Sequence, residues 1–229
     1  MTKRKNNKHT SYIQQNWRKL LTVILGLCIV FGRVVIPLSV DINIGVVCVE
    51  LLFEIIALAG AIFLNRKDIQ KIIADTKKDK KTVILKKAFL LLVIDYIVTV
   101  IMRIFCVYVL KSDDIALVRV QEGMSDISTI SIILVMISQV CLCPFSEELI
   151  FRKTIRDLIP NKVIYVIVSS LLFAFIHDWF FFSPGLLIYF VAGTVFALFY
   201  LKTGEKVQYT IAGHILINII ANIMTLCMS

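Results

Sequence analysis

Three short motifs in the C-terminal part of the sequence contain residue types that could carry out acid–base chemistry. They are Glu147–Arg152 (EELIFR), Phe173–His177 (FAFIH) and His214–Asn218 (HILIN). A carboxylate in an apolar environment suits a general base, and a histidine beside it can share the proton of an activated water. Histidine and asparagine N–H groups suit the stabilisation of an oxyanion. Together the motifs favour hydrolysis of an amide bond, provided that they meet in space.

Each motif by itself has an ordinary structural explanation. Two glutamates ahead of an arginine usually form a charge network on a helix surface. A histidine in an apolar helix usually packs with a single hydrogen bond, and an asparagine near it often joins two membrane helices. The functional interpretation therefore depends on how the three motifs are spaced along neighbouring helices.

The spacing predicts that the motifs lie at similar depth. Pro160 marks a turn, and at 1.5 Å per residue Glu147 and His177 each lie about 20–25 Å from it, on antiparallel helices. His214 lies about 15 Å beyond Gly204, where the next two helices turn on the same side. If the Pro160 turn projects into the cytoplasm, the three side chains are level, a short way below the membrane surface.

The helical period also predicts which side chains face one another. Glu148 and Arg152 are four residues apart and can pair on one helix face. That pairing would leave Glu147, on a different face, to meet His177. Phe173 lies one turn before His177, and we expect it to pack beneath the imidazole ring.

A metal site is the alternative chemistry for the same side chains. His214 and Asn218 are four residues apart and point the same way. His177, His214 and Glu147 could bind Zn²⁺, with Asn218 or a water completing the coordination. The sequence has no H-E-x-x-H helix, so the usual signature of zinc peptidases is missing.

The composition indicates that these motifs lie on membrane helices. Of 229 residues, 59% are hydrophobic, and the mean hydropathy is +0.86. Long apolar runs separated by charged clusters are typical of membrane spans, each of which needs about 20 residues. We predict an all-α, polytopic transmembrane bundle with about seven spans in one integral membrane domain. The predicted spans are Leu20–Leu38, Ile44–Leu64, Val83–Leu110, one from about Ile127, and about Val163–Phe182, Leu186–Leu201 and Val207–Met228.

The distribution of charge predicts orientation and organisation. Basic residues gather in the N-terminal tail and in residues 66–87, whereas residues 39–43 contain no lysine or arginine. By the positive-inside rule the N-terminus is cytoplasmic. The same distribution explains the net charge of +9 without nucleic acid as a partner. We divide the chain into a basic tail (1–19), three membrane helices with their connections (20–126) and the motif-bearing helices (127–229).

Charges inside the predicted spans need an explanation because each is costly in lipid. Arg33 and Glu50 are level in an antiparallel hairpin, so we expect a structural ion pair. Asp95 and Arg103 are assigned no catalytic role. Asp75–Lys81 is interpreted as a solvated charged loop.

The three motifs, in this order on successive helices, resemble the CPBP family. This family comprises CAAX prenyl endopeptidases of the Rce1 type and bacterial bacteriocin-processing and Abi proteins. Its pattern of EExxxR, FxxxH and HxxxN is matched, and the resemblance covers roughly residues 138–222. It implies catalytic roles for Glu147 and His177 on the water and for His214 and Asn218 at the oxyanion. Glu148 and Arg152 would be supporting residues.

The resemblance allows a metalloprotease or a metal-independent, glutamate-based mechanism. We expect no tightly bound cofactor, with Zn²⁺ as the alternative. The leading hypothesis is an intramembrane endopeptidase of the cell membrane that cleaves a short peptide or precursor, either a bacteriocin or pheromone leader or a CAAX-like C-terminus. Its partners would be the peptide or protein substrate and the lipid bilayer. The alternative hypothesis is a non-catalytic immunity or peptide-binding protein; a small transporter is less favoured, because no repeated halves are visible.

Overall fold

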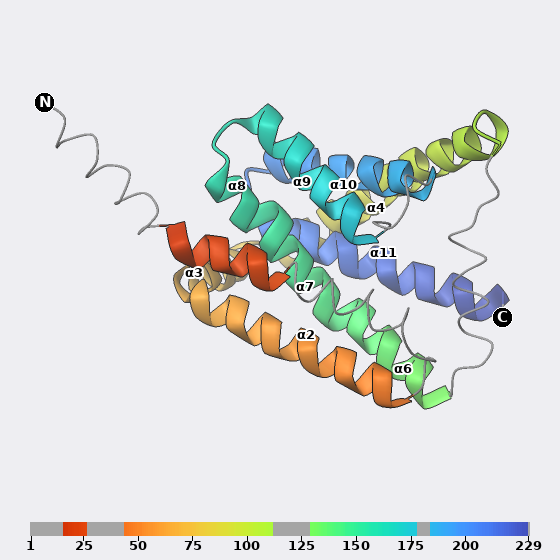
Figure 1. Ribbon diagram of the computed structural model, residues 1–229. Helices are drawn as coiled ribbons and strands as arrows, with labels where there is room; N and C mark the ends of the chain where they lie inside the picture. The colour runs from red at the N-terminus through yellow and green to blue at the C-terminus, as the bar shows by residue number, and fades with distance from the viewer. Residues whose placement is uncertain (1–15, 27–43, 112–128, 178–183, 229) are drawn as a thin grey trace, which may run out of the picture.

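The computed structural model describes residues 16–26, 44–111, 129–177 and 184–228 (Figure 1). Within these ranges the chain is helical and contains no strand, which confirms the predicted all-α class. Backbone groups in lipid have no water to bind, and a helix satisfies them internally. The long apolar runs of this sequence therefore form helices.

Five helices in the described part of the chain are long and apolar enough to cross a membrane. A sixth apolar helix, α9 (Lys162–His177), is shorter. The chain is thus a multi-pass integral membrane protein, as predicted. The five long helices are α2 (Ile44–Leu64), α4 (Lys81–Tyr108), the composite helix Thr129–Leu158, α10 (Pro184–Lys202) and α11 (Val207–Met228).

Several predictions lie wholly or partly outside the described residues. Residues 16–26 are helical, but most of the first predicted span lies outside the described residues. Arg33, the predicted partner of Glu50, also lies outside them. The loops at 39–43 and 112–126 fall outside as well. The count of about seven spans and the cytoplasmic N-terminus therefore stay predictions.

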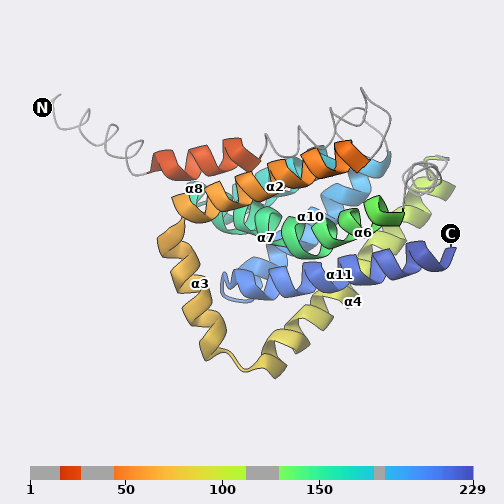
Figure 2. The same cartoon turned by 90° about the horizontal axis from the view of Figure 1, so that it is seen from below.

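The interpretation of Asp75–Lys81 as a charged loop is wrong. Helix α3 (Arg66–Lys78) covers most of it, and α4 begins at Lys81, two residues before the predicted start. Isoleucines at 69 and 72 recur at helical spacing between charged residues, and such a pattern stabilises an amphipathic helix once one face can pack. Figure 2 shows α3 crossing one end of the bundle, from the end of α2 to the start of α4.

The composite helix that carries the first motif is not a regular α-helix. It contains two wide, π-type turns, in which hydrogen bonds span five residues. The N–H of Cys143 bonds to the carbonyl of Ser138, and the N–H of Ile155 bonds to the carbonyl of Ile150. Its segments are α6 (Thr129–Ile137), η1 (Ser138–Leu142), α7 (Cys143–Glu147), η2 (Glu148–Thr154) and α8 (Ile155–Leu158).

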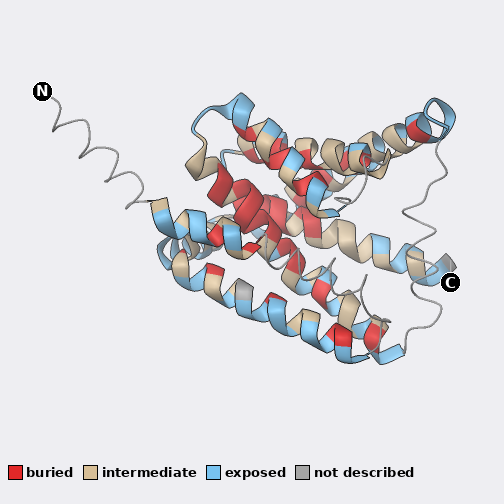
Figure 3. Cartoon of the chain, viewed as in Figure 1, coloured by how far each residue is buried: buried red, intermediate tan, exposed pale blue. Residues whose placement is uncertain are grey.

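Two glycines let neighbouring helices approach this region closely. A Cβ on Gly213 of α11 would lie 2.7 Å from Leu91 of α4, and one on Gly193 of α10 would lie 3.1 Å from the backbone of Ser170 on α9. Small residues at such crossings are typical of membrane helix packing. The buried residues gather where these helices surround α7 and η2, while α2 is largely exposed (Figure 3).

Candidate active site

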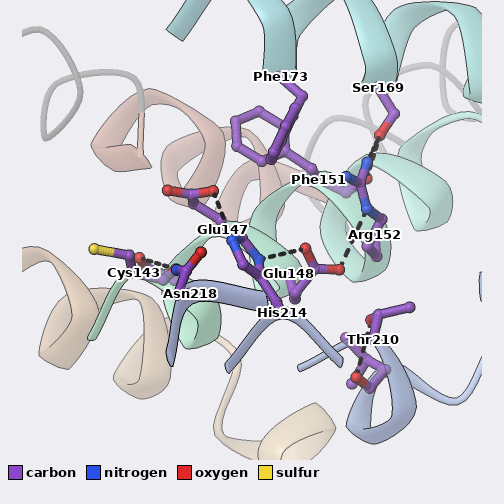
Figure 4. Close-up of polar contacts among 12 residues, drawn as sticks. Cys143, Glu147, Glu148, Phe151, Arg152, Ser169, Phe173, Thr210, His214 and Asn218 are labelled. Carbon is purple, nitrogen blue, oxygen red and sulfur yellow. Dashed lines mark hydrogen bonds and ion pairs between the residues drawn. The ribbon is translucent and has the colours of Figure 1, made fainter. Parts of the chain in front are cut away.

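The structure brings Glu147, His177 and His214 together from three helices. The Glu147 Oε2 atom lies 3.9 Å from the Nε2 atom of His177 on α9 and 3.9 Å from the Nε2 atom of His214 on α11. Glu147 is buried at the end of α7. Spacing had predicted this convergence, and Figure 4 shows the carboxylate of Glu147 next to the imidazole of His214.

Hydrogen bonds on the far side of each ring orient the two histidines. The Nδ1 atom of His177 lies 2.8 Å from the carbonyl oxygen of Phe173, and Nδ1 of His214 lies 3.1 Å from Oε1 of Glu148. A carbonyl or carboxylate only accepts, so we assign the proton to Nδ1 in both rings. In their neutral forms both rings then direct the lone pair of Nε2 at Glu147.

Glu148 and Arg152 form the predicted pair, in full burial. The Nε atom of Arg152 lies 3.3 Å from Oε2 of Glu148, and both side chains are 0% exposed. The guanidinium also donates from Nη1 to the Ser169 hydroxyl at 2.7 Å, and that hydroxyl donates to the carbonyl of Phe151. A buried charge needs such partners on every side, because an unpaired one is costly.

The contact between Glu148 and His214 was missed by sequence reasoning, which assigned Glu148 to Arg152 alone. A wide turn has more residues per turn than an α-helix, so consecutive residues diverge less around its axis. Glu147 and Glu148 can therefore both face α11 at the start of η2. Periodicity assumes regular helix geometry and could not detect this.

Ser169 was also missed, although a signal was present. It lies eight residues before His177 on α9, about two turns away on the same face. A buried hydroxyl on the face that carries the histidine is a candidate partner for the arginine of the first motif.

Aromatic rings surround the histidines. The Phe173 ring packs against His177 with centroids 4.4 Å apart, as predicted, and Tyr189 of α10 stacks on the same imidazole at 4.7 Å. Phe196 meets the His214 ring edge-on at 5.2 Å. The His177 side chain is 26% exposed, compared with 9% for Glu147, so the cluster is most accessible at His177.

Asn218 lies one turn beyond His214 on α11 and binds the first motif's helix. Its Nδ2 atom donates to the carbonyl oxygen of Gln139 at 2.7 Å. In a π-type turn that carbonyl would accept from residue 144, which is proline and has no N–H. The Asn218 amide thus compensates for Pro144 and keeps its second N–H as a donor.

The donor set has the right chemistry for zinc but not the arrangement. Two Nε2 lone pairs and one carboxylate would suit Zn²⁺, and Glu148 behind His214 would be a typical outer partner. In tetrahedral zinc sites neighbouring ligand atoms lie about 3.3 Å apart, whereas both Glu147–histidine distances are 3.9 Å. No group of three His, Cys, Asp or Glu in the described ranges is placed to hold a metal ion.

Two further buried carboxylates come from the N-terminal helices. Asp95 of α4 is buried, and its charge interacts with those of His214 and Arg152. Glu54 of α2 accepts a hydrogen bond from the Ser138 hydroxyl and joins α2 to η1. Asp95 therefore belongs to the electrostatic surroundings of the site, which its position in the sequence did not indicate.

Fold and site define a multi-pass integral membrane protein with a Glu/His cluster inside its helical bundle. Residues 129–220, which contain all the predicted site residues, match the family described as Type II CAAX prenyl endopeptidase Rce1-like. This part of the chain is similar to that family, and the match confirms the resemblance indicated by the three motifs.

One relative among curated proteins is the UPF0177 protein YxdF of Lactococcus lactis subsp. lactis (strain IL1403). It is 34% identical over 124 residues, which are 54% of this chain and 65% of the relative. The match therefore spans less than two thirds of that protein's length. No solved structure matches the chain.

Proposed function

We propose that the protein is an intramembrane endopeptidase that hydrolyses a peptide bond with a water activated by Glu147 and His177. The observation that carries the proposal is the position of Glu147 Oε2, 3.9 Å from two imidazole Nε2 atoms. A water oxygen at ordinary hydrogen-bond distance, about 2.8 Å, can reach two atoms so spaced. The similarity of residues 129–220 to a family described as endopeptidases supports the reaction class.

In the proposed mechanism Glu147 accepts a proton from the water, and the oxygen of that water attacks the carbonyl carbon of the substrate. As the carbonyl π bond breaks, the carbonyl oxygen becomes an oxyanion. The second N–H of Asn218 is a suitable donor to it. His214 can donate from Nε2 only when both its nitrogens are protonated, and the carboxylate of Glu148 would balance that charge. The oxyanion then collapses to restore the carbonyl as the C–N bond breaks, and the proton held by Glu147 passes through Nε2 of His177 to the leaving amine.

We further propose that the substrate is a short peptide or precursor that reaches the cluster from the His177 side. The partly exposed His177 is the accessible member of the cluster. Candidate substrates are a prenylated CAAX-type C-terminus and a leader-bearing bacteriocin or pheromone precursor. The roles of Glu148 and Arg152 are to orient His214 and to hold η2, without direct contact with substrate.

The test uses purified, bilayer-reconstituted protein and mass spectrometry of candidate peptides. Glu147→Gln and His177→Ala should each lower turnover by about 10²-fold or more. Glu54→Gln is the matched control, because it makes the same change at a buried carboxylate on α2. Equal turnover by wild type and Glu147→Gln would refute the proposal. Peptide binding without cleavage by any form would favour the immunity alternative.

A chelator arm addresses the metal. We expect turnover to persist after treatment with a strong chelator, because the mechanism uses protein groups alone. Loss of turnover on chelation, restored by Zn²⁺ and accompanied by stoichiometric zinc in the protein, would replace this mechanism with a metal-dependent one.

A further inference from the structure

Helix α3 is held at the membrane surface by its connections. Only Asn65 separates it from α2, and only Asp79 and Lys80 separate it from α4. Both neighbours are long and apolar enough to span the bilayer. Large apolar side chains of those spans near the ends of α3, such as Phe63 and Leu85, are exposed. A helix of this kind lies in the interface plane, beside the lipid headgroups.

Two acidic side chains near α3, Asp68 and Asp79, pair with residues outside the helix, whereas Asp75 pairs with Lys78 of α3 itself. Asp68 lies 3.4 Å from Nζ of Lys153 on η2. Asp79 accepts from Nζ of Lys206 at 2.7 Å and from Nε2 of Gln208 at 3.0 Å. The hydrogen bond from Lys206 holds the pKa of Asp79 below its usual range, so this carboxylate stays charged.

Several cations of α3 share one exposed face of the helix. Lys67, Lys71 and Lys78 recur at spacings of four and seven residues, which place them on one helix face. All three are exposed, and Ile72, on a different face, packs against the buried core. The exposed cations of α3 and the adjoining residues are Arg66, Lys67, Lys71, Lys77, Lys78, Lys80, Lys81 and Lys86.

We infer that this surface, which we call the basic α3 surface, binds the phosphate headgroups of anionic phospholipids. Its charge is complementary to theirs, and its height beside the bilayer puts headgroups within reach without any conformational change. A soluble acidic peptide would have the same charge but no reason to be concentrated at this level. The positive-inside rule explains why these residues are basic, but not why Asp68 and Asp79 pair with Lys153 of η2 and with Lys206.

The binding also has a structural path to the site. Lys206 and Gln208, which hold Asp79, stand at the start of α11, the helix that carries His214. Lipids bound to the basic α3 surface would thus lie on a helix that is hydrogen-bonded, through Asp79, to the start of the helix carrying His214. The inference itself concerns lipid binding and does not depend on the proposed hydrolysis.

The experiment compares lipid retention by matched variants. Protein is reconstituted in nanodiscs of phosphatidylcholine with a minor fraction of phosphatidylglycerol and then delipidated stepwise. Mass spectrometry measures the ratio of phosphatidylglycerol to phosphatidylcholine that stays bound. We expect enrichment of phosphatidylglycerol on wild type, reduced at least about tenfold by the double change Lys67→Gln and Lys71→Gln.

The matched control is Lys162→Gln with Lys202→Gln. It removes the same charge from two exposed lysines on other helices, and it should retain lipid as wild type does. Lys67→Arg with Lys71→Arg keeps the charge and should also retain lipid. Equal loss in the two glutamine doubles, loss in the arginine double, or no loss in any variant would overturn the inference.

A salt arm and a catalytic variant complete the design. Raising ionic strength to about 1 M, where the screening length falls to about 3 Å, should abolish the enrichment. Enrichment that resists salt would contradict recognition by the basic α3 surface. The measurement is repeated on Glu147→Gln, so that failure of the proposed peptidase activity does not change the lipid result.

Discussion

The centre of the motif-bearing region and the outer helix α2 handle burial in opposite ways. In η2 the consecutive residues Glu148–Arg152 are all buried, and two of them are charged. In α2, apolar side chains such as Ile56 and Phe63 are exposed, while the charged Glu54 is buried. Apolar groups lose nothing by facing lipid, whereas a polar group there needs a partner.

The comparison teaches that burial in this protein follows polarity more than hydrophobicity. Glu54 is one polar anchor from α2 to η1. Glu147, Glu148, Arg152 and His214 instead form one connected network. If this difference is correct, single substitutions should strongly reduce turnover or stability in the network. They should reduce stability moderately at its edge and hardly change either property on α2.

The largest expected effect is on catalysis, at Glu147. Glu147→Gln keeps the size of the side chain but removes the proposed base, so turnover should fall about 10²–10⁴-fold with little change in thermal stability. Peptide cleavage and the unfolding midpoint of the same preparation measure the two. A large loss of stability with unchanged turnover per folded molecule would reverse the assignment.

The next effect is on stability, at Arg152. Arg152→Met leaves the fully buried Glu148 without its guanidinium partner, and should destabilise the protein by about 3–5 kcal/mol. Thermal or denaturant unfolding in detergent measures it. Arg156→Met, at a partly exposed ion pair with Glu205, is the control and should cost about 1 kcal/mol or less. Similar costs for the two would show that the buried network is not special.

A moderate effect is expected at the edge of the network, from Asn218. Asn218→Ala leaves the Gln139 carbonyl without its donor and should cost about 0.6–2 kcal/mol. Pro144→Ala restores a backbone N–H that can bond to that carbonyl, so in this background the cost should shrink. A double-mutant cycle on unfolding free energies measures the coupling. Equal costs in both backgrounds would show that Asn218 does not compensate for the proline.

Smaller still is the expected effect of Glu54→Gln on α2. The glutamine carbonyl can still accept from the Ser138 hydroxyl, so the change in stability should stay below about 1 kcal/mol. Turnover should stay within a few-fold of wild type. A loss of turnover as large as that of Glu147→Gln would show that the network extends into α2 and that the two regions do not differ.

The smallest effect belongs to Phe63→Leu. This side chain is exposed on α2 near the basic α3 surface, and exchanging one apolar group for another in lipid should change stability by no more than about 0.5 kcal/mol. The unfolding midpoint is the readout. A marked shift would mean that Phe63 packs against a partner that its exposure does not reveal.

Much of the site could be predicted because its spacing follows regular helices and short turns. The meeting of Glu147, His177 and His214, the Glu148–Arg152 pair and the position of Phe173 all follow from rise and period. Helix α3 was missed because its charged residues resemble a solvated loop until a core is present for Ile72 to pack against.

The sequence by itself determined the helical class, the membrane location and the identity of the groups that could do chemistry. Composition determines which segments can face lipid, and residue type determines which side chains can accept or donate a proton. Only the tertiary structure decided how the two glutamates share His214 and why Asn218 turns to Gln139. The first depends on the wide turn η2, and the second on the Gln139 carbonyl of η1, which finds no N–H on Pro144. The periodicity of one helix contains no information about such contacts with its neighbours.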